Sequence, residues 1–477
     1  MNYRMIKYIL GWIMIFAAIF MAVPLITAVV YGEKAGWSFL ISAAVSAALG
    51  GLLIIRRPEN KVLYAREGFV IVSLSWILLS LCGSLPFVIS GAIPNYIDAL
   101  FETVSGFTTT GASILTEVES LPKCILMWRS FSHWVGGMGV LVFIMAFVQL
   151  SGGQNMHIMK AESPGPSVSK LVPRVKTTAL ILYSIYFVLT LIEFVLLLFG
   201  GLSVFEAANT AFATAGTGGF GIRNDSMGSF SPYVQIVVTV FMLLFSINFS
   251  SYYLILLRNF KDAFNCEVRW FLVIVAVVIT LITCNIADMF NTVGEALRHS
   301  AFTVASLIST TGFSTVDFDK WPELSRNLLV MVMFVGACAG STGGGIKVSR
   351  IIILFKSMGK ELENLIHPKQ VKKVTIDNRL VEHEVVRSVN VYMVAYVMLY
   401  VFSVIALSFD NHGFTTNFTA VAATINNIGP GLEMVGPTCN FSFFSPFSKI
   451  VLIFDMLAGR LELFPMLLLF TPATWKK

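Results

Sequence analysis

Apolar runs about as long as a membrane is thick recur along the whole chain, separated by shorter polar stretches. A helix needs about 20 apolar residues to cross roughly 30 Å of hydrocarbon, because each residue advances it by about 1.5 Å. By this criterion we expect ten membrane-spanning helices. They lie at 8–31, 37–55, 68–92, 125–149, 177–200, 231–257, 269–290, 326–356, 387–409 and 446–471.

Four shorter stretches between these spans resemble one another and are too short or too polar to cross a bilayer. They read YIDALFETVSGFTTTGASIL, SVFEAANTAFATAGTGGFGIRNDS, GEALRHSAFTVASLISTTGFSTVDFD and FTTNFTAVAATINNIGPGLEMVG. Each is a helix-length segment that ends in Thr, Ser, Asn and Gly and then returns irregularly to the surface. A unit of span, half-helix with glycine loop, and span therefore occurs four times, with Gly111, Gly219, Gly312 and Gly429 as equivalent points.

This repeat predicts the fold class. We expect an all-α polytopic membrane protein with four repeated helix–pore loop–helix units around a single pore, plus two extra N-terminal transmembrane helices. The N-terminal two-helix domain is expected at 1–60, and the pore repeats at 61–155, 170–260, 265–360 and 380–477.

Composition and charge agree with a membrane protein. The chain is 56% hydrophobic and 13% charged, whereas soluble domains are about 45–50% apolar and about 25% charged. Most of its 33 Lys and Arg residues fall on the side of the N-terminus, which predicts that both termini are cytoplasmic. The net charge of +6 is then a topology signal and implies no nucleic-acid partner. The lone cysteines and scattered histidines suggest neither an enzyme nor a bound cofactor.

The four glycine loops predict a cation pore. Backbone without helical hydrogen bonds survives at membrane depth only inside protein or along a wet cavity. Four such loops around one axis would stack carbonyl rings that replace the hydration shell of a monovalent cation, and glycine permits the angles required. The alternative is four interfacial turns with common glycines. The expected selectivity filter comprises Thr109, Thr110, Gly111, Thr217, Gly218, Gly219, Thr310, Thr311, Gly312, Asn427, Ile428 and Gly429.

Several segments resemble a known family. They are TTTGAS, ISTTGFST, GACAGSTGGGIKVSR, NNIGPGL and IFDMLAGRLELFPMLLLFTPATW, which are similar to the potassium-uptake superfamily of bacterial TrkH and KtrB subunits and plant HKT transporters. The two extra N-terminal spans and the NIGPGL loop look more like TrkH. The resemblance implies K+ at the filter residues, a bacterial inner membrane and a homodimer. It also implies a cytosolic ring of nucleotide-binding subunits of the TrkA type, controlled by ATP/ADP or NAD.

The filter loops are not identical, which affects the expected selectivity. The second loop reads GTGG where the first reads TTTG, and Pro430 follows the glycine of the fourth. We therefore expect moderate discrimination of potassium from sodium. Cation-coupled (H+ or Na+) symport, a less selective sodium/potassium transporter and a non-conducting regulatory subunit remain alternatives.

A glycine-rich segment, GACAGSTGGGIKVS at 336–349, interrupts the expected span 326–356. It resembles a phosphate-binding loop, but Ile346 and Lys347 stand where Lys followed by Ser or Thr is required. Gly343 lies 31 residues after Gly312, and Arg460 lies 31 residues after Gly429, so we expect the loop and the arginine to meet just below the filter.

An intramembrane arginine should face the pore or a partner, because burial in lipid is costly. The expected gate comprises Gly340, Ser341, Thr342, Gly343, Gly344, Gly345, Lys347 and Arg460. The alternative for Arg460 is an ion pair with Glu462 or Asp455 that only holds helices together. Carboxylates in the outer loops are expected either to attract cations at an entrance or simply to be solvated.

Overall fold

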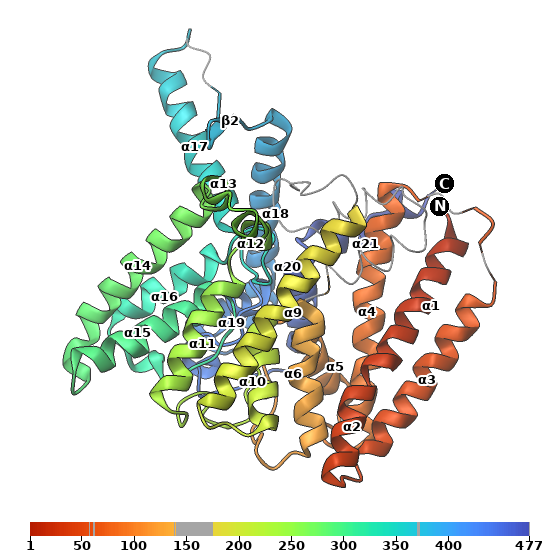
Figure 1. Cartoon of the computed structure of the whole chain (residues 1–477). Helices are drawn as coiled ribbons and strands as arrows, with labels where there is room; N and C mark the ends of the chain where they lie inside the picture. Colours follow the sequence, from red (N-terminus) through yellow and green to blue (C-terminus); the bar gives the residue numbers. More distant parts are fainter. Residues whose placement is uncertain (57, 61–62, 138, 140–174, 370–372, 477) are drawn as a thin grey trace.

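The computed structural model describes residues 1–56, 58–60, 63–137, 139, 175–369 and 373–476, and these residues form a helical bundle (Figure 1). The N-terminal part is a helical hairpin. It comprises α1 (Tyr3–Phe20), α2 (Ala22–Tyr31) and α3 (Gly36–Ile54). A Cβ atom at Gly11 would lie 2.8 Å from the carbonyl oxygen of Gly50, so this small-residue contact lets α1 and α3 pack closely.

Four units of helix, half-helix and returning helix follow, as expected from the sequence. The first comprises α4 (Ala65–Ile89), α5 (Tyr96–Phe107) and α6 (Lys123–Gly137). The second comprises α9 (Val175–Phe199), α10 (Val204–Ala215), α11 (Pro232–Phe245) and α12 (Phe249–Leu256), with α13 (Phe260–Ala263) after it.

The third and fourth units repeat this order. The third comprises α14 (Cys266–Ile286), η1 (Ala287–Met289), α15 (Val293–Ile308), η2 (Phe318–Lys320), α16 (Glu323–Val335) and α17 (Val348–Ile366). A short hairpin of β1 (Thr375–Ile376) and β2 (Arg379–Leu380) precedes the fourth unit. That unit comprises α18 (His383–Leu407), η3 (Ser408–Asp410), α19 (Phe414–Ile425), η4 (Glu433–Val435), α20 (Pro446–Arg460), α21 (Phe464–Phe470) and α22 (Pro472–Trp475).

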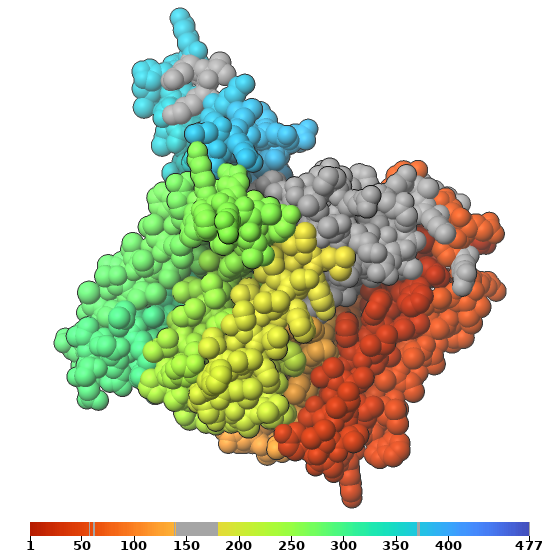
Figure 2. Space-filling view, in the orientation of Figure 1, coloured from red at the N-terminus to blue at the C-terminus, as the bar shows by residue number. Residues whose placement is uncertain are grey.

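The half-helices α5, α10, α15 and α19 lie in the half of the molecule away from the end that carries both termini (Figure 1). Serine, asparagine and threonine side chains begin three of them as N-caps, at Ser203, Asn95 and Thr292. The last part of α17 projects beyond the bundle on the side of the termini (Figure 2). The fold is therefore an all-α polytopic bundle with a fourfold repeat and an additional N-terminal hairpin.

Several expected spans are continuous helices, and three are interrupted. Among the described residues, six helices are long and apolar enough to cross a membrane, and the pair α11 and α12 qualifies only as a unit bent by 91°. The expected span 231–257 is therefore bent and not one straight helix, because Asn248 caps α12 and its side chain accepts a hydrogen bond from the Ser250 amide.

The expected span 446–471 is also interrupted. Helix α20 ends at Arg460, and Glu462 and Leu463 adopt positive φ angles of 55° and 66° before α21 begins. Span 326–356 is broken over 336–347, where the glycine-rich segment lies. The expected span 125–149 is helical to Gly137, and most of its remainder lies outside the described residues.

Candidate functional site

Each half-helix ends in the same backbone conformation, although the four sequences differ. The amides of Thr110, Gly218, Thr311 and Ile428 donate to carbonyls five residues earlier at 2.8–2.9 Å. The preceding residue in each loop is in the left-handed region, with φ of 57° at Thr109, 54° at Thr217, 60° at Thr310 and 54° at Asn427. Non-glycine residues rarely adopt this conformation, so its fourfold occurrence indicates a common structural demand.

A glycine lies two positions after the left-handed residue in each loop, and it is required in all four loops. Gly111, Gly219, Gly312 and Gly429 have φ between 76° and 102°. A Cβ atom at any of them would come within 3.0 Å of a backbone carbonyl oxygen in another loop. Glycine is thus needed both for its backbone angle and for the close approach of a neighbouring chain segment.

These approaches follow a closed order around one axis. Gly111 faces the carbonyl oxygen of Gly218, and Gly219 faces that of Thr311. Gly312 faces the carbonyl of Ile428, and Gly429 returns to that of Thr110. The loops of repeats 1, 2, 3 and 4 therefore form a ring in chain order. In each case the glycine of one loop faces the carbonyl oxygen of the residue directly before the glycine of the next loop.

The carbonyl groups of this ring have an unusual environment. Of the twelve residues expected to form a filter, nine are buried, and the glycines 111, 219 and 312 are half-buried. Within the described chain, none of their backbone carbonyl oxygens accepts a hydrogen bond. The great majority of buried backbone carbonyls in proteins accept a hydrogen bond, so a cluster of unpaired ones indicates a site for an electropositive ligand.

The side chains of the ring are less symmetric than its backbone. In repeats 1 and 3, a hydroxyl pair lies behind the loop, between Thr108 and Thr110 at 2.8 Å and between Ser309 and Thr311 at 2.6 Å. In repeat 4, the Asn427 amide donates to the Thr110 hydroxyl at 3.0 Å and so joins the last loop to the first.

The glycine-rich segment 336–347 lies directly against this ring. Its Gly344 amide donates to the Thr310 hydroxyl at 2.6 Å, and its Gly345 amide donates to the Asn426 carbonyl at 3.1 Å. Helix α16 precedes it, whereas a phosphate-binding loop follows a strand. The structure therefore supplies no phosphate-loop geometry here.

The residues at the break between α11 and α12 form hydrogen bonds with the same glycine-rich segment. The Cys338 amide donates to the Ser246 carbonyl at 3.0 Å, and the Phe249 amide donates to the Gly340 carbonyl at 3.1 Å. The Thr342 hydroxyl donates to the carbonyl of Phe245 at 3.1 Å. The interruption of one repeat thus supplies hydrogen-bond partners for the interruption of the next.

Arg460 meets the segment, as the equal sequence offsets predicted. Its guanidinium donates to the Thr342 carbonyl at 2.8 Å and to the Gly136 carbonyl of α6 at 2.6 Å. Lys347, which has a φ of 81°, donates through its ammonium group to the Gly343 carbonyl. Two cationic side chains therefore bind carbonyls of one loop.

The acidic residues near Arg460 have other contacts. Glu462 forms an ion pair with Arg350 of α17, and that guanidinium lies 4.1 Å from the centre of the Tyr392 ring. Asp455 accepts a hydrogen bond from the Ser403 hydroxyl at 2.8 Å.

A carboxylate that the sequence did not single out contacts both the segment and the start of the helix α17 that follows it. Glu267, near the start of α14, accepts hydrogen bonds from the Ala339 amide at 2.7 Å and from the Ser349 amide at 3.2 Å. Its early position in an apolar helix gave no signal of these contacts, because both partners are more than 70 residues away along the chain.

The outer carboxylates are engaged in ion pairs and hydrogen bonds. Asp98 pairs with Lys449 at 2.6 Å, and Asp319 pairs with Arg326 at 3.2 Å. The buried Glu102 pairs with Arg129 at 2.8 Å. These contacts reduce the negative charge available to attract cations, so the expected ring of free carboxylates is at least partly neutralised.

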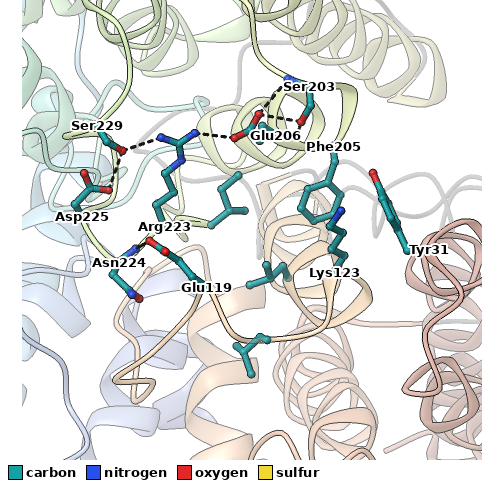
Figure 3. Close-up of a pocket in the computed structure, with 13 residues that line it drawn as sticks. Tyr31, Glu119, Lys123, Ser203, Phe205, Glu206, Arg223, Asn224, Asp225 and Ser229 are labelled. Carbon is teal, nitrogen blue, oxygen red and sulfur yellow. Dashed lines mark hydrogen bonds and ion pairs between the residues drawn. The ribbon is translucent and has the colours of Figure 1, made fainter.

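A cavity of about 860 Å³ opens at the same end of the molecule, between α2, α10 and the loops before α6 and after α10 (Figure 3). Glu206 on its wall pairs with Arg223 at 2.8 Å. Partial burial favours the protonated carboxyl, but the bonds from Arg223 and Ser203 outweigh it and lower the pKa of Glu206. Within the described chain, no cluster of three or more metal-ligating acidic, Cys or His side chains occurs.

Comparisons with known proteins agree with this architecture. The TrkH family, described as cation transport proteins, matches residues 35–477. The chain is 36% identical to the Trk system potassium uptake protein TrkH of Escherichia coli K12, and 34% identical to TrkH of Halomonas elongata, with all of each chain covered. It also matches the crystal structure of the potassium transporter TrkH from Vibrio parahaemolyticus over all of both chains, with a TM-score of 0.90 and 33% identity. The chain therefore belongs to the TrkH family of cation transport proteins.

Proposed function

We propose that this protein takes up potassium ions across the cell membrane through a channel-like pore, with the twelve loop residues as its selectivity filter. The observation that carries the proposal is the ring of loop carbonyls that accept no hydrogen bond from the described chain. Such carbonyls can replace the water around a monovalent cation. The names of the relatives, which are potassium uptake proteins, favour potassium as the ion.

The orientation of the half-helices favours a cation over an anion. Helices α5, α10, α15 and α19 all end at the ring. The C-terminal end of a helix carries about half a negative charge. Four such ends stabilise a positive ion at the axis and disfavour a negative one.

We further propose that segment 340–345, with Lys347 and Arg460, is the gate. The segment lies against the third and fourth filter loops and is bound by both cationic side chains. Arg460 would hinder cations in two ways: its charge repels them, and its hydrogen bonds hold the segment in place. Opening would require those bonds to exchange for others.

The assembly and its regulation are also part of the proposal. We propose a homodimer in a bacterial plasma membrane with both termini in the cytoplasm, controlled by a cytosolic nucleotide-binding ring subunit. The termini and the projecting end of α17 lie at one end of the molecule (Figure 1), which gives such a subunit a surface to contact. Within each chain, we propose the domain limits given above, from the N-terminal two-helix domain at 1–60 to the fourth pore repeat at 380–477.

Rubidium uptake into proteoliposomes containing the purified protein tests the function. We expect uptake that follows the electrochemical gradient, with potassium competing better than sodium. Uptake that depends on a proton or sodium gradient would instead identify a coupled symporter. If a protein that remains folded carries no monovalent cation, the proposed function is wrong.

A further inference from the structure

His133 of α6 lies fully buried between the first two filter loops. Its Nδ1 is 2.8 Å from the Gly106 carbonyl oxygen, in the last turn of α5. The Phe220 amide, directly after the second filter loop, donates to its Nε2 at 3.2 Å. A carbonyl can only accept and an amide can only donate, so the ring is neutral with its proton on Nδ1.

The imidazole also occupies the space of a missing filter side chain. Gly218 stands at the ring position that Thr110, Thr311 and Ile428 fill in the other loops. A Cβ atom at Gly218 would overlap the imidazole ring of His133, within 3.0 Å. The φ of Gly218 is not in the positive region, so the backbone would tolerate a side chain there and the imidazole is what excludes it.

The position two residues earlier shows the same replacement. Thr108 and Ser309 supply hydroxyls behind loops 1 and 3, whereas repeat 2 has Gly216. A Cβ atom at Gly216 would overlap the backbone carbonyl of His133. The hydroxyl pair of loops 1 and 3 is thus absent from repeat 2, and one residue of α6, His133, fills the space of both of its members.

Arg129, one helical turn before His133, completes this contact with the second loop. Its guanidinium donates to the Gly221 carbonyl at 3.1 Å and lies 4.2 Å from the centre of the Phe220 ring. The Phe220 ring in turn lies 4.3 Å from the imidazole, centre to centre. Two side chains of α6, Arg129 and His133, therefore hold the residues that directly follow the second loop.

We infer that His133 is a positioning residue that sets ion selectivity, because its ring is the substitute for a filter side chain in repeat 2. This inference rests on the proposed potassium pore. Losing the ring removes the hydrogen bond to the Phe220 amide and the packing against Gly218 that anchor loop 2. Its carbonyls are then no longer held at one distance from the ion and can also close around the smaller sodium ion. The GTGG sequence of the second loop is then an adaptation to His133 and not a defect of the filter.

The test compares rubidium and sodium uptake in the same proteoliposomes. For His133→Ala, we expect the rubidium-to-sodium uptake ratio to fall roughly 5- to 30-fold, the factor expected when one or two net hydrogen bonds are lost. Gly218→Ala should lower the ratio as well, because its methyl group displaces the imidazole. The double variant H133A/G218A should recover part of the ratio lost by either single change. The methyl group introduced at position 218 can then fill the space that the missing imidazole leaves.

Three controls make the outcome specific. His133→Gln keeps an acceptor for the Phe220 amide and should lose less selectivity than His133→Ala. His299→Ala removes another buried histidine, which contacts Thr315 at 2.9 Å, and should leave the ratio unchanged. Thermal unfolding in detergent identifies variants that have not folded; if His133→Ala is one of them, Gly218→Ala and His133→Gln decide the question.

Two results would overturn the inference. One is an unchanged ratio in folded His133→Ala or in Gly218→Ala. The other is a double variant that loses the sum of both single effects, which would mean that the two sites do not share space. Absence of rubidium uptake by the unaltered protein would instead overturn the proposed function, so the two failures are distinguishable.

Discussion

Removing the guanidinium of Arg460 tests the gate most directly. The side chain donates two hydrogen bonds, at 2.8 Å to Thr342 and at 2.6 Å to Gly136. A hydrogen bond from a charged donor contributes about 1.5–3 kcal/mol, and the lower limit applies because Arg460 is only half-buried. Only the bond to Thr342 attaches to the segment itself, because Gly136 belongs to α6. This bond then stabilises the closed segment by about 1.5 kcal/mol, which is roughly a 10-fold change in the equilibrium between closed and open forms.

Arg460→Ala should therefore raise rubidium uptake into proteoliposomes, up to the limit set by the fully open pore. Arg460→Gln and Arg460→Lys separate the two contributions. If the positive charge is the main barrier, Gln raises uptake and Lys does not. If hydrogen bonding holds the segment, both raise it, since neither side chain reproduces the forked guanidinium, whose two terminal nitrogens reach Thr342 and Gly136 separately. Unchanged uptake in folded Arg460→Ala and Arg460→Gln protein would refute the reasoning.

Three further outcomes are expected. Deleting residues 339–344 should raise cation uptake, because the obstructing segment is removed; reduced uptake by a folded variant would contradict the gate. Gly312→Ala should abolish selective uptake, since φ is +85° and the added methyl would overlap a carbonyl, while Gly359→Ala, with nothing within 4 Å, should leave uptake unchanged. Because the pKa of Glu206 is lowered from 4.5, its pairing stabilises the fold above that pH and is lost as pH falls further. Glu206→Gln should therefore flatten the acid dependence of thermal unfolding below pH 4.5; an unchanged profile would contradict this assignment.

The repeat and the depth of its elements could be predicted because they depend on local composition. Apolar length identified the outer helices, and the equal spacing from Gly312 to Gly343 and from Gly429 to Arg460 predicted which elements meet. Hydropathy could not place the break between α11 and α12. Ser246 and Asn248 are small polar residues in an apolar run, and whether such residues bend a helix depends on a partner that offers hydrogen bonds. Here that partner is the segment containing Gly340, from another repeat.

The supporting contacts of the site were missed for a related reason. No motif or spacing in the sequence marks His133 or Glu267 as part of the site. Both act on backbone groups, at Phe220 and Ala339, and any residue can supply a backbone group. Sequence patterns therefore contain no signal for such pairs. The one available indication was the loss of side chains at Gly216 and Gly218 in a repeat whose counterparts retain them.

The ring of four loops is built from a single chain, and this has a consequence for how a pore can be controlled. A pore assembled from four identical subunits must carry any added feature four times, and all copies act on the axis together. Among the residues that the structure describes, the glycine-rich segment, Arg460 and the imidazole next to loop 2 each occur once. If the segment is the gate proposed above, one quarter of the ring is obstructed or released while the other three quarters keep their geometry, and the movement of one side of the wall switches conduction.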